Sequence, residues 1–204
     1  MLFTETIDPV TLAVLNNLMA HQSTKNFVLV GGTALALQVG HRKSIDLDLF
    51  TIDVFNPDQL LAALSTDFMP IVLQKSALSP ICTIEGIKID FIHFRYPFIR
   101  PIRQENGIWL LSIEDIAPMK LDAISGRGSK KDFYDVYFLL KQFTLEKMFS
   151  LYMEKYPHQT TFHVLRSLAY FEDAEKDPDP VVFDTSITWP VVKSKIAEVI
   201  RNFG

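Results

Sequence analysis

Residues 27–50, FVLVGGTALALQVGHRKSIDLDLF, hold the clearest pattern in this chain of 204 residues. An apolar run ends at the double glycine Gly31-Gly32, a short helical pattern follows, and Gly40 breaks it. A basic loop then leads into a second apolar run that two aspartates interrupt. The order predicts a strand, a glycine turn, a helix, a basic loop and an acidic strand.

Asp46 and Asp48 alternate with the apolar residues Ile45, Leu47 and Leu49. Successive side chains of a strand point to opposite faces, so the two aspartates share one face and the apolar residues face a core. Neighbouring carboxylates repel each other unless a cation lies between them. The pattern therefore predicts a divalent metal site. The alternative interpretation is a solvated strand whose charges discourage edge pairing.

The double glycine and the helix after it are typical of an anion-binding site. Glycine permits close backbone approach, and the N–H groups at a helix N-terminus bind anions. A phosphate cradle next to a Mg²⁺ site is what binding of a nucleoside triphosphate (NTP) requires. The segment lacks the Gly-Lys-Ser/Thr ending of a Walker loop, so a P-loop is not predicted.

Gly31-Gly32 followed by Asp46-x-Asp48 resembles the signature of the nucleotidyltransferase superfamily, which has the polymerase-β-like fold. The longer motif that runs from Gly31 to Phe50 is similar to one branch of this superfamily, the AbiEii/AbiGii-type toxins. A second block resembles the same branch and consists of Met119, Lys120, Leu121, Asp122, Ala123, Ile124, Arg127, Lys131, Asp132, Phe133, Tyr134 and Asp135. The two blocks cover residues 27–50 and 112–141.

The resemblance implies a third metal-binding carboxylate on a strand beside the acidic one. Residues 81–84 and 87–92 predict a hairpin around Glu85-Gly86, and Asp90 lies in its second arm between apolar neighbours. We therefore expect Asp90 to complete the metal site with Asp46 and Asp48, and to help deprotonate the attacking hydroxyl. A strand-end charge that reaches water is the alternative.

The resemblance also implies a triphosphate site. Its expected residues are Gly31, Gly32, Thr33, Arg42, Ser44, Lys120 and Lys131. Asp135, on a predicted helix from residue 131 to 141, is expected to join the catalytic group as a supporting or acid–base residue. Ordinary solvent exposure for Lys120, and a favourable interaction with the helix dipole for Asp132 and Asp135, are the alternatives.

Composition and charge argue against several other classes of protein. Hydrophobic residues make up 48% of the chain, and the single cysteine, Cys82, excludes an internal disulfide framework. A net charge of −4 argues against a broad nucleic-acid surface, although the basic patches at 41–43 and 127–131 adjoin the motifs. The apolar runs are too short to span a membrane and the N-terminus lacks the order of a signal peptide, so we expect a cytoplasmic protein.

The predicted fold class is α/β (α+β). Residues 1–111 would form a nucleotidyltransferase-like core, a small mixed sheet with flanking helices, and residues 112–204 a helical C-terminal portion. Helices are predicted to begin at Asp8-Pro9 and Asn56-Pro57. Further helices are predicted at 145–155, 162–171 and 191–203.

The expected activity is Mg²⁺-dependent transfer of a nucleoside monophosphate (NMP) from an NTP to an acceptor hydroxyl, with two Mg²⁺ ions. The resemblance implies RNA as the acceptor, with tRNA foremost, a toxin–antitoxin or phage-defence setting, and a winged-helix antitoxin as partner. Two other functions stay open: transfer of AMP to a Tyr, Ser or Thr of a protein, and nucleotide binding without catalysis.

Overall fold

The computed structural model describes residues 1–76 and 79–203, which form two compact units. We call residues 1–40 with 44–112 the sheet unit. Residues 41–43 with 113–204 form the helical unit. The segment 41–43 follows the sheet unit's glycine-containing helix in sequence but packs with the helical unit.

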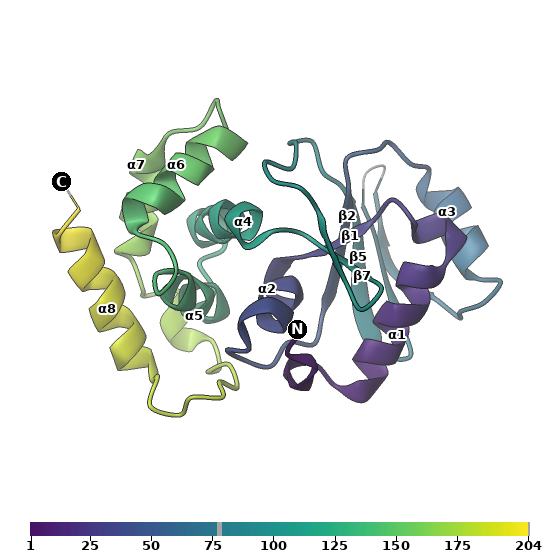
Figure 1. The fold of residues 1–204 in the computed structure, drawn as a ribbon, viewed down its shortest axis with the longest axis horizontal. Helices are drawn as coiled ribbons and strands as arrows, with labels where there is room; N and C mark the ends of the chain where they lie inside the picture. The colour runs from purple at the N-terminus through teal and green to yellow at the C-terminus, as the bar shows by residue number, and fades with distance from the viewer. Residues whose placement is uncertain (77–78, 204) are drawn as a thin grey trace. The chain divides into compact units, whose positions relative to one another are not determined.

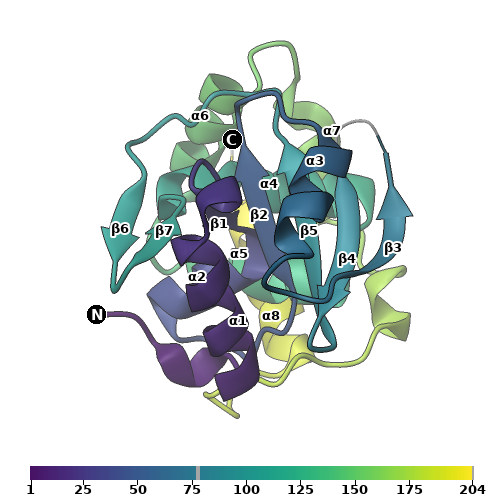
Figure 2. The same ribbon diagram turned by 90° about the vertical axis from the view of Figure 1, so that its right-hand side faces the viewer.

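The described residues of the sheet unit build one mixed sheet, with strand order β3-β4-β5-β2-β1-β7-β6 (Figure 2). The pairs β2–β5 and β1–β7 are parallel, and the other neighbours are antiparallel. The strands are β1 Val28–Val30, β2 Leu47–Thr51, β3 Ile71–Lys75, β4 Pro80–Ile84, β5 Ile87–His93, β6 Arg103–Glu105 and β7 Ile108–Leu110.

Helices cover both faces of this sheet. The helices α1 (Pro9–Ala20) and α3 (Pro57–Leu64) lie on one face, and α2 (Gly31–Val39) lies on the other (Figure 1). Proline occupies the first position of α1 and α3, where its missing N–H costs nothing. Asn56 caps α3 through its side-chain oxygen, as its sequence position predicts. Two short 3-10 turns, η1 (Thr4–Thr6) and η2 (Gln22–Thr24), flank α1.

The sheet's core side is apolar. Leu47, Leu49, Ile89 and Phe91 from the central strands are fully buried, and burial of each such side chain stabilises the fold by about 1.5–3 kcal/mol. The prediction that Ile45 faces the core is wrong, because Ile45 is 63% exposed. The reason is that β2 begins only at Leu47, so the alternation does not extend back to position 45.

Two tight turns shape the sheet's hairpins. Glu85 and Gly86 have φ values of 51° and 79°, which is the pattern of a type I′ turn and confirms the hairpin predicted there. Asn106 and Gly107, at 52° and 80°, make the same turn between β6 and β7.

The helical unit contains α4 Ile113–Gly126, α5 Lys130–Leu139, α6 Leu145–Lys155, α7 Thr161–Leu168, the short turn η3 Ala174–Lys176 and α8 Trp189–Arg201 (Figure 1). The long helix α4 packs against α5, α6 and α7, while α8 packs against α5 and α7. Helices α5, α6, α7 and α8 confirm helices that the sequence predicts, and α5, α7 and α8 each begin and end earlier than expected.

The segment 41–43 is bound to the loop before α8 by backbone hydrogen bonds. The Lys43 amide donates to the Val181 carbonyl at 2.8 Å, and the Phe183 amide donates to the His41 carbonyl at 3.1 Å. These bonds place His41 and Arg42 inside the helical unit, where both are buried.

A buried ion pair crosses α4 and α6. Lys155 Nζ lies 2.7 Å from Oδ1 of Asp115, and both side chains are fully buried. Burial lowers the pKa of Lys155, and the Asp115 charge offsets part of that effect.

Over the part of the chain that is described, every helix is too short or too polar to cross a membrane.

Candidate active site

Asp48 and Asp90 are register partners on the parallel strands β2 and β5. The pair before them, Leu47 and Ile89, is fully buried, so the two carboxylates leave the sheet on the opposite, half-exposed face. Asp46 lies just before the first residue of β2 and is also half-buried. The structure therefore brings Asp90 beside Asp48, in the arrangement that the resemblance implied.

Gly31 makes a close approach to this face. Its φ is +69°, and a Cβ built on it would lie 2.3 Å from Oδ2 of Asp48. Any side chain at this position would be strained and would also collide with the carboxylate. Gly32 follows it in the first turn of α2. Glycine is thus required here by the carboxylate that it borders.

Thr33 and Ser44 hold the loop that leads into β2. The hydroxyl of Thr33, which is buried, donates to the backbone carbonyl of Asp46 and lies 2.8 Å from Ser44 Oγ, whose hydroxyl can donate to it. The Ser44 amide in turn donates to the Thr6 carbonyl at 2.9 Å. Both residues therefore position the acidic strand, and this role does not depend on a bound phosphate.

The sequence did not point to Lys88, which lies two residues before Asp90 on β5. Its Nζ is 2.6 Å from Oδ1 and 2.8 Å from Oδ2 of Asp90. Alternation in this arm already places Lys88 and Asp90 on one face, but it does not predict the ion pair between them.

The donor chemistry of this face fits a hard divalent cation, because aspartate oxygens are the ligands that Mg²⁺ and Mn²⁺ prefer. Two of the three carboxylates are direct neighbours across the strands. In the described residues, no three His, Cys, Asp or Glu side chains already converge as a metal site. The metal assignment to Asp46, Asp48 and Asp90 thus stays a prediction that the strand register supports.

In the helical unit, Asp135 is the centre of a buried ionic cluster. Its Oδ1 accepts from Arg42 Nε and His41 Nε2, both at 2.7 Å. Its Oδ2 lies 2.9 Å from a terminal guanidinium nitrogen of Arg42 and 2.7 Å from Lys120 Nζ. Burial would raise the pKa of Asp135, but Arg42 and Lys120 hold it well below its usual range. Asp135 is therefore ionised at neutral pH.

Asp132 extends the cluster one helical turn away. It accepts from Arg127 Nε at 2.8 Å, from Ser129 Oγ at 2.7 Å and from Lys120 Nζ at 3.1 Å. Burial opposes its ionisation, yet Lys120 and Arg127 lower its pKa to about 2. Four buried charged side chains thus satisfy one another, with the exposed Arg127 at the edge of the cluster: Arg42, Lys120, Asp132 and Asp135.

The predicted phosphate-binding residues of this unit differ in accessibility. Arg42 and Lys120 are only 3% and 4% exposed and are engaged with carboxylates, whereas Lys131 is exposed. To contact a phosphate, either buried cation would have to leave a carboxylate partner. The contacts of Arg42 and Lys120 with these carboxylates favour a role in holding the helical unit together. Lys131 has the accessibility that phosphate binding needs.

His41 is a buried member of the cluster that the sequence pointed to only as part of a basic loop. Its pKa is lowered by burial, and only partly restored by Asp135, so the ring is neutral at pH 7. A carboxylate can only accept, so Nε2 carries the proton. Nδ1 has no hydrogen-bond partner among the described residues, and the ring packs on Phe138 with centroids 4.9 Å apart.

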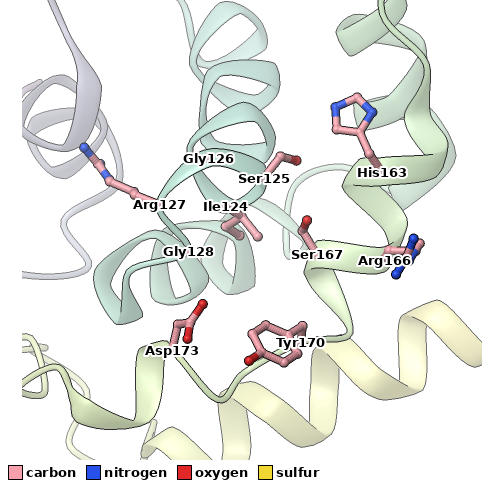
Figure 3. A pocket seen from close by; sticks show the side chains of 10 residues that line it. All are labelled: Ile124, Ser125, Gly126, Arg127, Gly128, His163, Arg166, Ser167, Tyr170 and Asp173. Atoms are coloured by element: carbon pink, nitrogen blue, oxygen red, sulfur yellow. The ribbon is translucent and has the colours of Figure 1, made fainter.

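The helical unit also contains a polar pocket of about 380 Å³ between the end of α4 and helix α7 (Figure 3). Its lining comprises Ile124, Ser125, Gly126, Arg127, Gly128, His163, Arg166, Ser167, Tyr170 and Asp173. None of the predicted metal-binding or phosphate-binding residues is among them. The pocket is therefore separate from the predicted chemistry.

Comparison with known proteins agrees with this reading. A family model described as "Nucleotidyl transferase AbiEii toxin, Type IV TA system" matches residues 13–100 and 82–195. An uncharacterized protein of Aquifex aeolicus (strain VF5) is 36% identical over 187 residues, which cover 87% of this chain and 89% of that protein. The family match includes all three aspartates of the sheet unit.

Solved structures share the fold at low sequence identity. MenT4, a nucleotidyltransferase toxin from Mycobacterium tuberculosis H37Rv, superimposes with a TM-score of 0.63 at 14% identity, over 94% of this chain and 82% of that one. JHP933 from Helicobacter pylori superimposes with a TM-score of 0.53 at 18% identity, over 96% and 94% of the two chains. The mixed α/β architecture is confirmed as the fold of these proteins.

Proposed function

Since this chain belongs to the AbiEii family of nucleotidyl transferase toxins, we propose that it moves an NMP unit from an NTP to an RNA hydroxyl with Mg²⁺ bound at Asp46, Asp48 and Asp90. Membership makes the chain a nucleotidyltransferase. The metal, the acceptor and the biological setting are the parts proposed here.

One observation carries the metal assignment, the pairing of Asp48 with Asp90 across parallel strands next to Gly31. The three carboxylates supply the charge and the oxygen ligands that Mg²⁺ prefers. Bound Mg²⁺, proposed as two ions, would neutralise charge on the triphosphate and lower the pKa of the acceptor hydroxyl.

We assign the proton transfer, the binding of the triphosphate and the positioning of the acidic strand to residues of the sheet unit. Asp90 would take the proton of the acceptor hydroxyl, whose oxygen forms a bond to the α-phosphorus while the bond to pyrophosphate breaks. Gly31 and Gly32 would let the triphosphate approach the start of α2, where N–H groups bind anions. Thr33 and Ser44 would keep the loop before β2 in place through their hydrogen bond. No covalent enzyme intermediate is needed, because positioning and electrostatics carry such transfers.

In the helical unit, we propose Lys131 as a phosphate ligand because its side chain is accessible. Asp135 would act as a supporting carboxylate that fixes Arg42 and Lys120, since all three are buried together. Any contribution of Arg42 or Lys120 to phosphate binding would then depend on release from Asp135.

The biological setting proposed is a toxin–antitoxin pair, as in the family description, with a winged-helix regulator as the antitoxin. The name of MenT4, a nucleotidyltransferase toxin with the same fold, supports this setting. The proposed acceptor is RNA, with tRNA as the first candidate, and a cytoplasmic location would give access to both RNA and NTP.

The test is transfer of label from each of the four α-labelled NTPs in the presence of Mg²⁺, total tRNA and a mixture of proteins. We expect the label in the RNA fraction, and its loss in the double variant Asp46→Ala/Asp48→Ala. Unchanged thermal unfolding of that variant would show that the fold is intact.

Three results would contradict the proposal in different ways. Undiminished labelling by the double variant would reject the carboxylate site. Label in protein would indicate AMP transfer to a side chain. NTP binding without release of pyrophosphate, whichever acceptor is present, would indicate a module that binds nucleotide without catalysis.

A further inference from the structure

The acidic face of the sheet unit carries its own cation, Lys88. Its Nζ contacts both oxygens of Asp90, at 2.6 and 2.8 Å, so the ammonium spans the carboxylate. The Lys88 side chain is 41% exposed and that of Asp90 only 16% exposed. The lysine therefore covers the carboxylate from the solvent side.

Lys88 lies on the same face of the sheet as Asp48 and Asp90. It is two residues before Asp90 on β5, and Ile89 between them is buried on the opposite face with Leu47. The strand register places Asp48 directly opposite Asp90, and Asp46 lies just before the first residue of β2. Lys88 thus brings a positive charge to the face that carries Asp48 and Asp90.

A lysine in this place has a defined electrostatic effect. Adjacent carboxylates repel each other, and an ammonium between them relieves that repulsion. The same two Asp90 oxygens are the ones that a divalent metal would need. An ammonium and a metal ion therefore compete for one carboxylate.

We propose that Lys88 is a positioning residue that acts as the built-in counter-ion of Asp90, holding this carboxylate in the metal-free protein and setting the metal affinity of the site by competition. The proposal rests on the metal site of the proposed function. Binding of the metal then requires exchange of the Lys88–Asp90 ion pair for a metal–Asp90 contact, and the lysine becomes available to an anion.

The direct test is the affinity for Mn²⁺ alone, measured from the signal of free Mn²⁺ in electron paramagnetic resonance, without NTP. Lys88→Met keeps an unbranched side chain that is one atom shorter and removes its charge. A partly exposed ion pair contributes little stability, so we expect Mn²⁺ binding to tighten by roughly threefold to tenfold. Lys88→Arg should restore the weaker affinity of the natural chain.

A matched control is available on the same sheet. Lys75 on β3 forms an equally short ion pair, 2.6 Å, with Asp58, and this pair is exposed. Lys75→Met should therefore leave Mn²⁺ affinity unchanged. Thermal unfolding in EDTA adds a second measurement: Lys88→Met should lower the melting temperature more than Lys75→Met, and Mn²⁺ should remove that difference.

Equal or weaker Mn²⁺ binding by Lys88→Met would overturn the counter-ion role. If that result accompanied label transfer that Asp46→Ala/Asp48→Ala abolishes, the inference alone would fail. If Lys88→Met tightened Mn²⁺ binding but no NMP transfer occurred, the inference would stand without the proposed reaction. Absence of Mn²⁺ binding by both proteins would reject the inference and the metal site together.

Discussion

Asp48 on β2 and Asp90 on β5 are direct partners across parallel strands, so two carboxylates from segments about forty residues apart share one half-exposed face of the sheet. Parallel pairing requires a long connection between the strands, and here α3, β3 and β4 provide it. The connection brings together two acids that repel each other. Lys88 forms an ion pair with Asp90, and its charge offsets part of that repulsion.

Replacement of Gly31 should damage both stability and activity. Gly31→Ala introduces about 1–2 kcal/mol of backbone strain at positive φ, and relief of the collision with Asp48 adds about 1–3 kcal/mol. Gly86→Ala is the matched control, because Gly86 has a φ of +79° but open space around it. Urea unfolding of both variants should show the larger loss for Gly31→Ala, together with loss of label transfer. Equal losses of unfolding free energy in the two variants would mean that the Asp48 side chain can shift away from the new methyl group at little cost.

Arg42 should contribute to stability through Asp135. Arg42→Ala leaves a buried carboxylate without its two-pronged partner and should lower the free energy of unfolding by about 3–5 kcal/mol. Arg42→Lys should recover little of this, because an ammonium cannot make the paired contacts. Arg166→Ala, which removes an exposed arginine, should change it by less than about 0.5 kcal/mol. Native stability of Arg42→Ala with a raised KM for NTP would instead support direct phosphate binding.

Acid should destabilise the helical unit through Asp132. Its pKa is about 2 in the folded chain and 3.8 without these contacts, so its contribution is complete above pH 4 and is lost as the pH falls toward 2. The size of the contribution is on the order of 2 kcal/mol. Asp132→Asn should flatten this part of a plot of unfolding free energy against pH. Glu198→Gln, which alters an exposed pair with Lys195, should leave the slope as it is.

Lys131 should affect nucleotide binding and not stability. Because the side chain is exposed, Lys131→Ala should change the free energy of unfolding by less than about 0.5 kcal/mol. Loss of one phosphate contact should raise the KM for NTP by roughly tenfold, as measured by the rate of label transfer. Lys195→Ala, at a partly exposed lysine of α8, provides the control. An unchanged KM in Lys131→Ala would remove this residue from the phosphate site.

Local patterns predicted much of the fold. Asn56-Pro57 fixed the start of α3 through a cap, Glu85-Gly86 fixed a hairpin, and residues 145–155 confirmed a predicted helix to the residue. Each of these signals acts within a few residues. Ile45 shows the limit, because alternation alone does not reveal where a strand begins.

The site was less visible because its contacts join distant positions. The sequence suggested that Asp90 would lie near Asp48, but only strand register could make them partners. In the sequence, Arg42 is part of a basic loop and has no evident partner. In the structure its guanidinium contacts Asp135, which is 93 positions away. Lys88 was missed because a charged residue in a half-exposed strand gives no signal of its partner.

The most direct measurement of the central claim is the location of bound manganese. A crystal of the protein grown with Mn²⁺ and a non-hydrolysable NTP analogue would show manganese by its anomalous scattering. We predict peaks coordinated by Asp48 and Asp90, with Asp46 as a further ligand and Lys88 displaced from Asp90. Manganese bound with the analogue elsewhere, while Lys88 still spans Asp90, would contradict the account.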